Sequence, residues 1–277
     1  MEPFVRFGQI AVPEPGEGQV RIKLVLASVN PSDEMFIQGL YGQPRIRGYA
    51  AWFEGVGVVV ASGGGPVADG ILGRRVAFVA AAGATGTWSE YPIADVARCI
   101  PLIDAVRDED GAAMVVNPLT ALAMFDIVRQ DGAQAFILSA GASQLSKLLI
   151  GAAAEEDYRP IAIVRRDSQI EPLQSLGAAH ILNSEADDFR NQLSAVLREE
   201  KPLVFLDAVA NQVSAGVFTA IARRARWVIY GTLDTELPKL LEPDQLTFMM
   251  KQIEGFWLVR WMQETSPADK RAAIDAA

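Results

Sequence analysis

Cysteine and histidine are almost missing from this sequence of 277 residues, which contains one of each, Cys99 and His180. A single cysteine cannot form a disulfide within the chain; that suits a reducing compartment, and we expect a cytoplasmic protein. A structural zinc site usually needs four Cys or His ligands, and a catalytic site about three protein ligands. We therefore expect no bound metal, although carboxylates could in principle hold zinc, and we interpret His180 as a structural residue at the start of a strand.

Positive charge is also scarce, because 25 Lys and Arg face 34 Asp and Glu, for a formal net charge of -9. Binding to nucleic acid needs clustered basic surface that neutralises phosphates, so we expect no nucleic-acid partner. No apolar run reaches the roughly 18 residues of a membrane span, and the first residues lack the pattern of a signal peptide. We expect no membrane partner either. Half of the residues (50%) are hydrophobic, which is enough for sizeable cores.

The first part of the chain has the pattern of strands separated by glycine and proline. Residues 19–29 alternate apolar and polar side chains, as a half-buried strand does. A β-branched run at residues 54–61, a run at 74–79 after a turn, and a second alternating segment at 87–93 are further expected strands. This pattern predicts a small, mostly β domain, a barrel or sandwich, over residues 1–110.

From about residue 107 the pattern changes to strands alternating with helices. Acidic residues precede an expected helix at 112–128, in which Pro118 should produce a kink or a join. Expected strands follow at residues 135–139, 161–164, 180–182, 203–206, 227–230 and 255–258, with helices at 143–154, 170–176, 187–198 and 213–221. This alternation predicts βαβ units and a doubly wound parallel sheet, an α/β fold of the Rossmann type, over residues 111–277.

The turn after the first of these strands is a candidate phosphate-binding loop. In such folds this turn brings helix N–H groups to a dinucleotide's pyrophosphate. The usual Gly-x-Gly-x-x-Gly is here Gly141-x-Ser143-x-x-Ser146, with small residues at all three places. The loop is equally compatible with an ordinary strand-to-helix turn. Its candidate cofactor-binding residues are Gly141, Ala142, Ser143, Gln144 and Leu145.

Two arginines follow the second strand of this half, where a dinucleotide fold places the residue that recognises the ribose. An acidic side chain there binds the 2′-hydroxyl of NAD, whereas a guanidinium matches the 2′-phosphate of NADP. Arg165 and Arg166 therefore favour NADPH as the cofactor. The alternative is that both are solvated surface residues.

Several segments together resemble the medium-chain dehydrogenase/reductase superfamily, on its zinc-free quinone-reductase and enoyl-thioester-reductase side. Residues 28–33, Ser-Val-Asn-Pro-Ser-Asp, are similar to a segment that carries a zinc-binding Cys in alcohol dehydrogenases, and that place is Asn30 here. Trp52-Phe53-Glu54 stands where the zinc enzymes have Gly-His-Glu, and the four-cysteine lobe is absent. The resemblance implies a GroES-like catalytic domain followed by a Rossmann domain, without zinc.

Within the superfamily, the likeness to mitochondrial-type 2-enoyl thioester reductases is closer. Residues 36–42, Phe-Ile-Gln-Gly-Leu-Tyr-Gly, resemble the stretch with their catalytic tyrosine, which would be Tyr41. Residues 116–121, Val-Asn-Pro-Leu-Thr-Ala, resemble a cofactor-contacting segment, and residues 230–233 and 255–261 resemble segments that line the nicotinamide. The cofactor-binding residues implied by these matches are Asn117, Thr120, Tyr230, Gly231, Thr232, Leu233, Phe256 and Trp257.

The resemblance implies a reductase in which NADPH delivers hydride to the β-carbon of an α,β-unsaturated carbonyl. Tyr41 would then donate to the enolate oxygen or supply the final proton, and Asn30 and Ser32 would orient the nicotinamide or the substrate. Asn30 and Ser32 also fit an ordinary turn or helix cap, Tyr41 fits packing in a glycine-rich loop, and Glu54 fits a structural carboxylate. Five aromatic residues could wall a pocket or serve the cores: Trp52, Phe53, Trp88, Phe256 and Trp257.

Two alternatives to this function remain open on the sequence. One is a quinone oxidoreductase that uses the same hydride, and the other is a catalytically silent dinucleotide-binding paralogue. The second is motivated by Ser143 and Ser146 in the loop, and by a catalytic half that looks incomplete at both termini when set beside the family. The family also implies a homodimer that joins edge strands, here residues 255–261.

Overall fold

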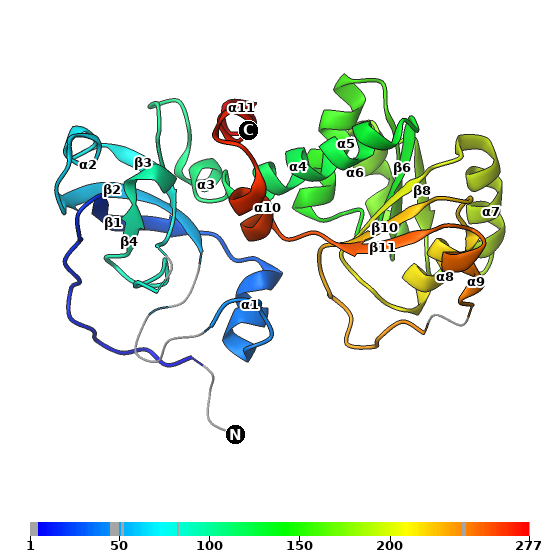
Figure 1. Ribbon diagram of the computed structural model, residues 1–277, viewed down its shortest axis with the longest axis horizontal. Helices are drawn as coiled ribbons and strands as arrows, with labels where there is room; N and C mark the ends of the chain where they lie inside the picture. Colours follow the sequence, from blue (N-terminus) through cyan, green and yellow to red (C-terminus); the bar gives the residue numbers. More distant parts are fainter. Residues whose placement is uncertain (1–4, 45–49, 51–52, 82, 240–241, 277) are drawn as a thin grey trace. The chain divides into compact units, whose positions relative to one another are not determined.

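The computed structural model describes residues 5–44, 50, 53–81, 83–239 and 242–276. The chain divides into two units, Met1–Val116 and Asn117–Ala277, and each contains one β-sheet (Figure 1). No helix in the described part of the chain has both the length and the apolar character needed to cross a bilayer.

The first unit is built on an antiparallel sheet of five strands in the order β4-β1-β2-β3-β5. In β1 the apolar residues Val20 and Ile22 are buried, while the polar residues between them are more exposed, as the alternation predicts. Val20 and Ile22 pack with Phe78 of β3 in the core of this unit. Its elements are β1 (Gln19–Ala27), α1 (Pro31–Gln38), β2 (Glu54–Ser62), α2 (Pro66–Gly70), β3 (Arg75–Val79), β4 (Ile93–Asp95), the 3₁₀ turn η1 (Val96–Arg98), β5 (Cys99–Pro101) and α3 (Asp108–Gly111).

The strand expected at residues 87–93 is wrong except for its last residue. Residues 87–91 form bends, Pro92 has no regular structure, and Ile93 is the first residue of β4. The bends still lie beside β1, because Leu24 donates its N–H to the carbonyl of Glu90 and Ile22 donates to that of Pro92. Pro92 has no N–H to return to a ladder, so alternation alone does not make this segment a regular strand.

The second unit is a parallel sheet of six strands in the order β11-β10-β9-β6-β7-β8. In chain order from β6 this is the 3-2-1-4-5-6 arrangement of a doubly wound dinucleotide fold, so the expected fold class is confirmed. Its elements are α4 (Val116–Asp131), β6 (Ala135–Leu138), α5 (Gln144–Glu155), β7 (Arg159–Val164), η2 (Asp167–Gln169), α6 (Ile170–Ser175), β8 (His180–Asn183), α7 (Phe189–Glu200), β9 (Val204–Asp207), α8 (Gln212–Ala220), β10 (Arg226–Ile229), α9 (Asp244–Thr247), β11 (Gln252–Gly255), α10 (Leu258–Glu264) and α11 (Pro267–Ala276).

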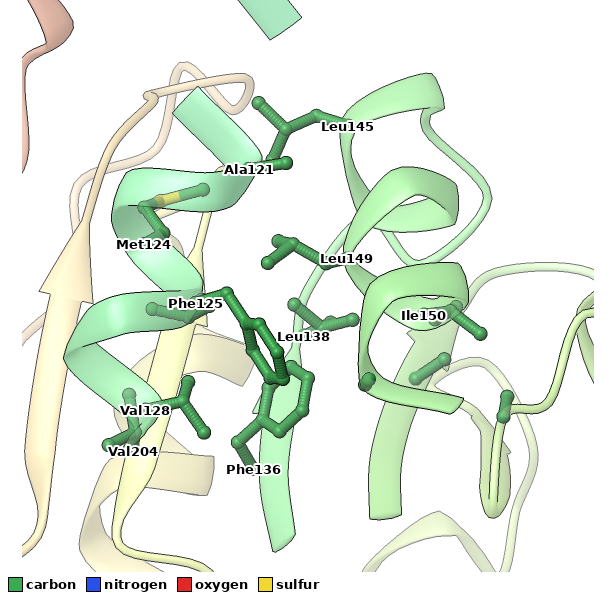
Figure 2. Close-up of a cluster of buried hydrophobic side chains, with 14 of the residues drawn as sticks. Ala121, Met124, Phe125, Val128, Phe136, Leu138, Leu145, Leu149, Ile150 and Val204 are labelled. Carbon is green, nitrogen blue, oxygen red and sulfur yellow. The ribbon is translucent and has the colours of Figure 1, made fainter. Parts of the chain in front are cut away.

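Helices cover both faces of this parallel sheet. Successive residues of β6 point to opposite faces, so Phe136 and Leu138 pack with α4 and α5, whereas Ile137 packs with α7 and α8. Figure 2 shows the first of these cores, where Phe125 of α4 lies against Phe136 with ring centroids 6.0 Å apart. Burial of each such large apolar side chain contributes about 1.5–3 kcal/mol, which fixes the strand ends that carry the candidate site.

The expected helix at residues 112–128 begins later than its apolar pattern suggested. Residues 108–111 form the short α3, and α4 starts at Val116, so Pro118 lies in the first turn and the helix continues to Asp131. An N–H in the first turn has no partner within the helix, so a proline is tolerated there. The interpretation of Pro118 as a kink or join inside a longer helix was therefore wrong.

The expected strand at residues 255–258, and the edge strand at 255–261, are wrong in their bounds, since only Gly255 of these residues belongs to a strand. The edge strand β11 ends at Gly255, and α10 begins at Leu258 with Trp257 at its N-cap. Residues 252–255 contain only one large apolar residue, Ile253, which is expected at an edge that is not covered on both faces. The apolar run Phe-Trp-Leu-Val that follows resembles a buried strand, yet it belongs mostly to the turn and to the helix.

Candidate functional site

The loop between β6 and α5 forms the turn expected at the carboxyl end of the first strand of the doubly wound sheet. Ser143 is the N-cap of α5, and its Oγ accepts the N–H of Ser146 at 3.2 Å. Ala140 adopts a positive φ of 46°, which turns the chain sharply from the strand into the helix. The N–H groups of Gln144 and Leu145, in the first turn, have no carbonyl partner within the helix and are available to an anion.

Gly141 allows this loop to pass close to the neighbouring strand. Its N–H donates to the carbonyl of Ile163 at 2.9 Å. A Cβ at this position would lie 2.8 Å from the Cβ of Ala162 and 3.2 Å from the carbonyl oxygen of Ile163. Only glycine fits without a shift of the backbone, so the loop has the shape of a phosphate cradle, and this shape fits a dinucleotide.

We expect Gly141→Ala to weaken NADPH binding about tenfold, which corresponds to about 1.4 kcal/mol. The added methyl would push the loop away from β7 and displace the N–H groups that face the ligand. Gly151→Ala is the matched control, because Gly151 lies in the same helix α5 with open space around its Cβ position. That variant should bind NADPH normally, and equal affinity of both variants in a fluorescence titration would contradict the cradle.

The two serines that replace glycines of the usual fingerprint are accommodated by hydrogen bonds. Ser146 is fully buried, and its hydroxyl donates to the carbonyl of Ser139 at 3.4 Å, while Ser143 Oγ donates to Ser146 Oγ at 3.0 Å. Ser139 Oγ in turn accepts the N–H of Ala208, at the end of β9, at 2.8 Å. Ser139 therefore links the ends of β6 and β9, the neighbouring strands between which the order of the sheet reverses, and Ser146 is bonded to its carbonyl.

Arg165 and Arg166 follow β7 directly and are both exposed. The backbone N–H of Arg165 donates to Gln169 Oε1 at 3.3 Å, which orders the turn after the strand. Among the residues that the structure describes, neither guanidinium has a hydrogen-bonded partner. Both side chains can therefore bind an anion without first breaking a bond within the protein.

Asp207, the last residue of β9, belongs to the same edge and was missed by sequence reasoning. Its side chain is fully buried, and its carboxylate accepts bonds from Trp227 Nε1 at 2.8 Å, Val209 N at 2.9 Å and Ala210 N at 3.1 Å. Ala210 has a positive φ of 56°, so these bonds hold a tight turn. The sequence could have indicated Asp207, because it is an acidic residue at the end of the apolar strand segment Leu203-Val-Phe-Leu-Asp207.

The segment after β10 contains the residues expected to line the nicotinamide. Tyr230 is half-buried and its hydroxyl is buried; burial raises the pKa of this group, and the neighbouring Ser146 side chain opposes that shift. A Cβ on Gly231 would lie 2.8 Å from the carbonyl oxygen of Ala208, so this glycine also permits a close approach of backbones. Thr232 and Leu233 are exposed, and Leu233 donates its N–H to Ala208 O at 2.9 Å.

Four other predicted cofactor residues lie on α4 and after β11. Asn117, half-buried, and Thr120, buried, are both in the first turns of α4. Phe256 packs against the core that contains α4 and α5 and donates its N–H to Ile229 O at 2.8 Å. Trp257 is half-buried at the N-cap of α10. In this unit the structure thus gathers Gly141–Leu145, Tyr230–Leu233 and Phe256 at the carboxyl ends of β6, β10 and β11.

The predicted catalytic residues lie around α1 in the first unit. Asn30 is its N-cap and Ser32 lies in its first turn, whereas Tyr41 follows its C-cap, Gly39. Eight helical residues, about 12 Å, separate the two ends, so Tyr41 does not share one end of the helix with Asn30 and Ser32. The Tyr41 ring packs on Phe53 with centroids 5.0 Å apart, and Trp52 lies outside the described residues.

Glu54 organises the other end of α1. This carboxylate is 1% exposed and accepts from Ser28 Oγ at 3.1 Å, Asn30 Nδ2 at 3.2 Å, Val115 N at 3.2 Å and Val116 N at 2.8 Å. Burial raises the pKa of Glu54, and the hydrogen bonds oppose that shift. Asn30 Nδ2 donates to Ser28 Oγ as well, at 3.1 Å, so both of its amide protons are engaged within the protein.

Comparisons with known proteins agree with this arrangement. The zinc-binding dehydrogenase family profile matches residues 144–275, and the alcohol dehydrogenase GroES-like domain profile matches residues 16–104. The chain is 31% identical over 260 residues to human mitochondrial enoyl-[acyl-carrier-protein] reductase, covering 90% of this chain and 67% of that protein. It is 28% identical over 269 residues to the mitochondrial enoyl-[acyl-carrier-protein] reductase of Dictyostelium discoideum, covering 93% of this chain and 74% of that protein.

A crystal structure from Mesorhizobium loti, provisionally named an NADPH:quinone reductase, matches with a TM-score of 0.91 and 55% identity, covering 96% of this chain and 77% of that one. The chain belongs to the medium-chain dehydrogenase/reductase superfamily. The resemblance inferred from the sequence motifs is therefore confirmed.

Members of this superfamily differ in whether they hold zinc, so the candidate metal ligands matter. In the described ranges one group of ligand atoms lies close enough for an ion, from His180, Glu199 and Glu200, within 4.8 Å of one another. Glu200 is already bonded by Arg159 Nε at 2.7 Å and by His180 Nε2 at 2.6 Å. The Arg159 guanidinium, with a smaller contribution from His180, lowers the pKa of Glu200 to about 2. This cluster lies at the amino ends of β7 and β8, away from the loops described above.

Proposed function

We propose that this chain is an NADPH-dependent, zinc-independent reductase that transfers hydride to the β-carbon of an α,β-unsaturated carbonyl, such as an enoyl thioester. The observation that carries the cofactor assignment is the cradle at Gly141 together with the two unpaired arginines that follow β7. The names of the relatives, mitochondrial enoyl-[acyl-carrier-protein] reductases, support the substrate class.

The residues proposed to hold the cofactor come from the ends of the strands, from α4 and from the start of α10. The N–H groups of Ala142, Gln144 and Leu145 would bind the pyrophosphate with help from Ser143, and Arg165 and Arg166 would bind the 2′-phosphate. Tyr230 is proposed to line the nicotinamide from the end of β10, where its buried hydroxyl lies beside Ser146 of the phosphate-binding loop. The remaining residues proposed to line the nicotinamide are Asn117, Thr120, Gly231, Thr232, Leu233, Phe256 and Trp257. Bound NADPH supplies a hydride at its nicotinamide ring.

Tyr41 is proposed to donate a hydrogen bond to the substrate carbonyl oxygen. Negative charge develops on that oxygen as the enolate forms, so a positioned donor stabilises the transition state more than the ground state. Asn30 and Ser32 are proposed to orient the substrate or the nicotinamide. Both amide protons of Asn30 are engaged with Ser28 and Glu54, and these bonds fix the orientation of its side chain at the start of α1.

Zinc independence is proposed from the residues at the family's ligand places. Asn30 and Phe53 stand where the zinc enzymes have Cys and His, and the chain has one cysteine and one histidine in total. Burial raises the pKa of the Cys99 thiol to about 12, which disfavours the thiolate that a metal needs. Added zinc should therefore leave the reductase rate unchanged.

Quinone reduction is the second candidate, because the M. loti protein at 55% identity has the provisional name NADPH:quinone reductase. The two are distinguished by following NADPH oxidation with crotonyl-CoA and with 1,4-naphthoquinone under the same conditions. A higher kcat/KM for crotonyl-CoA supports the enoyl reductase. A higher value for the quinone supports the alternative, and no turnover of either supports the catalytically silent paralogue.

The assembly and location of the protein remain predictions. A homodimer would join two copies of the edge strand β11, whose outer side has no partner strand in the described sheet. We also propose a cytoplasmic location, on the grounds of the single cysteine.

We expect Arg165→Ala to weaken NADPH binding at least tenfold and to leave NADH binding within about twofold, since only NADPH carries the 2′-phosphate. Arg190→Ala removes the same charge from an exposed position on α7 and serves as the control. Parallel titrations with both nucleotides measure the effect. An equal loss for NADPH and NADH would contradict the proposed role of Arg165.

A further inference from the structure

The loop that follows β10 folds back over the end of β9. Leu233 donates its N–H to Ala208 O at 2.9 Å, and Asp234 donates its N–H to Val209 O at 3.3 Å. Both acceptors lie in the turn that the buried carboxylate of Asp207 holds. Asp234 is therefore attached to the carboxyl end of β9 rather than extended beyond β10.

The Asp234 carboxylate is held in place by two donors. It accepts from Asn211 Nδ2 at 2.8 Å and from the N–H of Glu236 at 3.1 Å. These two bonds, the one from Asn211 foremost, hold the pKa of Asp234 below its usual range, and the positive charge of Arg165 adds to the effect. Asp234 is thus a fixed negative charge within electrostatic reach of Arg165.

The order of the strands places the two charges on opposite sides of the phosphate-binding loop. Across the sheet the order is β10-β9-β6-β7. Asp234 is attached to the end of β9, Arg165 follows β7, and the loop at residues 139–143 follows β6 between them. A dinucleotide bound at that loop with its 2′-phosphate at Arg165 would therefore have the Asp234 carboxylate at the same edge of the sheet.

We propose that Asp234 is a specificity-determining residue of the dinucleotide site: its fixed carboxylate, at the same edge of the sheet as Arg165, repels the 2′-phosphate and limits the preference for NADPH over NADH. The proposal rests on the proposed NADPH site. A 2′-phosphate carries about two negative charges, so the carboxylate repels it while Arg165 attracts it. NADH has a neutral hydroxyl there, so the same carboxylate affects it less.

The test uses half-cofactors that isolate this end of the site, adenosine 2′,5′-bisphosphate and adenosine 5′-monophosphate. Calorimetric titrations of the wild-type chain, Asp234→Asn and Glu236→Gln give the affinities. Glu236→Gln removes an equal charge from the same loop and is the matched control. We expect Asp234→Asn to bind the bisphosphate about threefold or more tightly, to change monophosphate binding by less than about 1.5-fold, and to lose this gain at high salt.

An unchanged ratio of the two affinities in Asp234→Asn, or weaker binding of the bisphosphate, would overturn the proposal. So would an equal gain in Glu236→Gln, because the effect would then reflect net charge rather than this carboxylate. Binding to the wild-type chain distinguishes a failure of the proposed NADPH site from a failure of the role of Asp234 alone. If it fails to prefer the bisphosphate, the proposed NADPH site is wrong and the role of Asp234 falls with it. If it shows that preference and Asp234→Asn does not alter it, the role of Asp234 alone is wrong.

Discussion

Replacement of Tyr41 by Phe is expected to lower kcat for crotonyl-CoA by about 10²- to 10⁴-fold, the usual contribution of a positioned acid or donor. The substitution keeps the ring and therefore its packing on Phe53, 5.0 Å between centroids, and removes only the hydroxyl. The hydroxyl would meet charge that develops mainly in the transition state, so KM for NADPH should stay within about twofold. Steady-state kinetics with both substrates varied measure the two effects.

Tyr158→Phe is the matched control for this variant. Tyr158 lies in the second unit, where its ring packs edge-on against Phe125 at 5.1 Å. It loses the same hydroxyl, and its kcat should remain at the wild-type value. If Tyr41→Phe also kept full kcat, Tyr41 would be a packing residue and the donor to the carbonyl oxygen would have to be another group.

Replacement of Asp207 by Ala is expected to lower the free energy of unfolding by about 3–5 kcal/mol, since it leaves Trp227 Nε1 and two backbone N–H groups without an acceptor. Each unsatisfied buried donor costs about 1–3 kcal/mol. The indole of Trp227 lies between Phe205 and Phe218 in the core and cannot reach water without disturbing both rings.

Urea unfolding monitored by tryptophan fluorescence tests this expectation. Asp207→Asn keeps one acceptor oxygen and should have an intermediate midpoint. Asp187→Ala removes an exposed carboxylate and should change stability by no more than about 0.5 kcal/mol. A midpoint for Asp207→Ala that equals that of Asp187→Ala would show that the buried hydrogen bonds do not hold this turn.

The alternation of strands and helices in the second unit could be predicted from the sequence because each element is short, apolar on the correct period and bounded by a turn. β6, β7, β9 and β10 are buried on both faces, so they stand out as apolar runs. The boundary between β11 and α10 could not be predicted from apolar runs. An edge strand needs few apolar residues, and the aromatic run after Gly255 has the composition of a strand although it caps a helix.

Residues of the candidate site could be predicted from the sequence only where a local motif requires a particular residue type. Gly141 is one such case, because a turn into a helix beside a neighbouring strand requires the absence of a Cβ. Asp207, Glu54 and Asp234 depend on partners distant in the sequence, such as the bond between Asp207 and Trp227 or that between Glu54 and Val116. Single-sequence patterns do not report such pairs. The roles of Tyr41 and Asn117 came from family resemblance and remain predictions.

The central claim is that the second unit binds NADPH through the cradle at Gly141 and the arginines after β7. Titration of the wild-type chain with NADPH and, separately, with NADH, followed by quenching of tryptophan fluorescence, tests it most directly. The account predicts that NADPH binds at least tenfold more tightly, about 1.4 kcal/mol. Equal affinity for the two nucleotides would contradict the role of Arg165 and Arg166, and no binding of either would contradict the cradle itself.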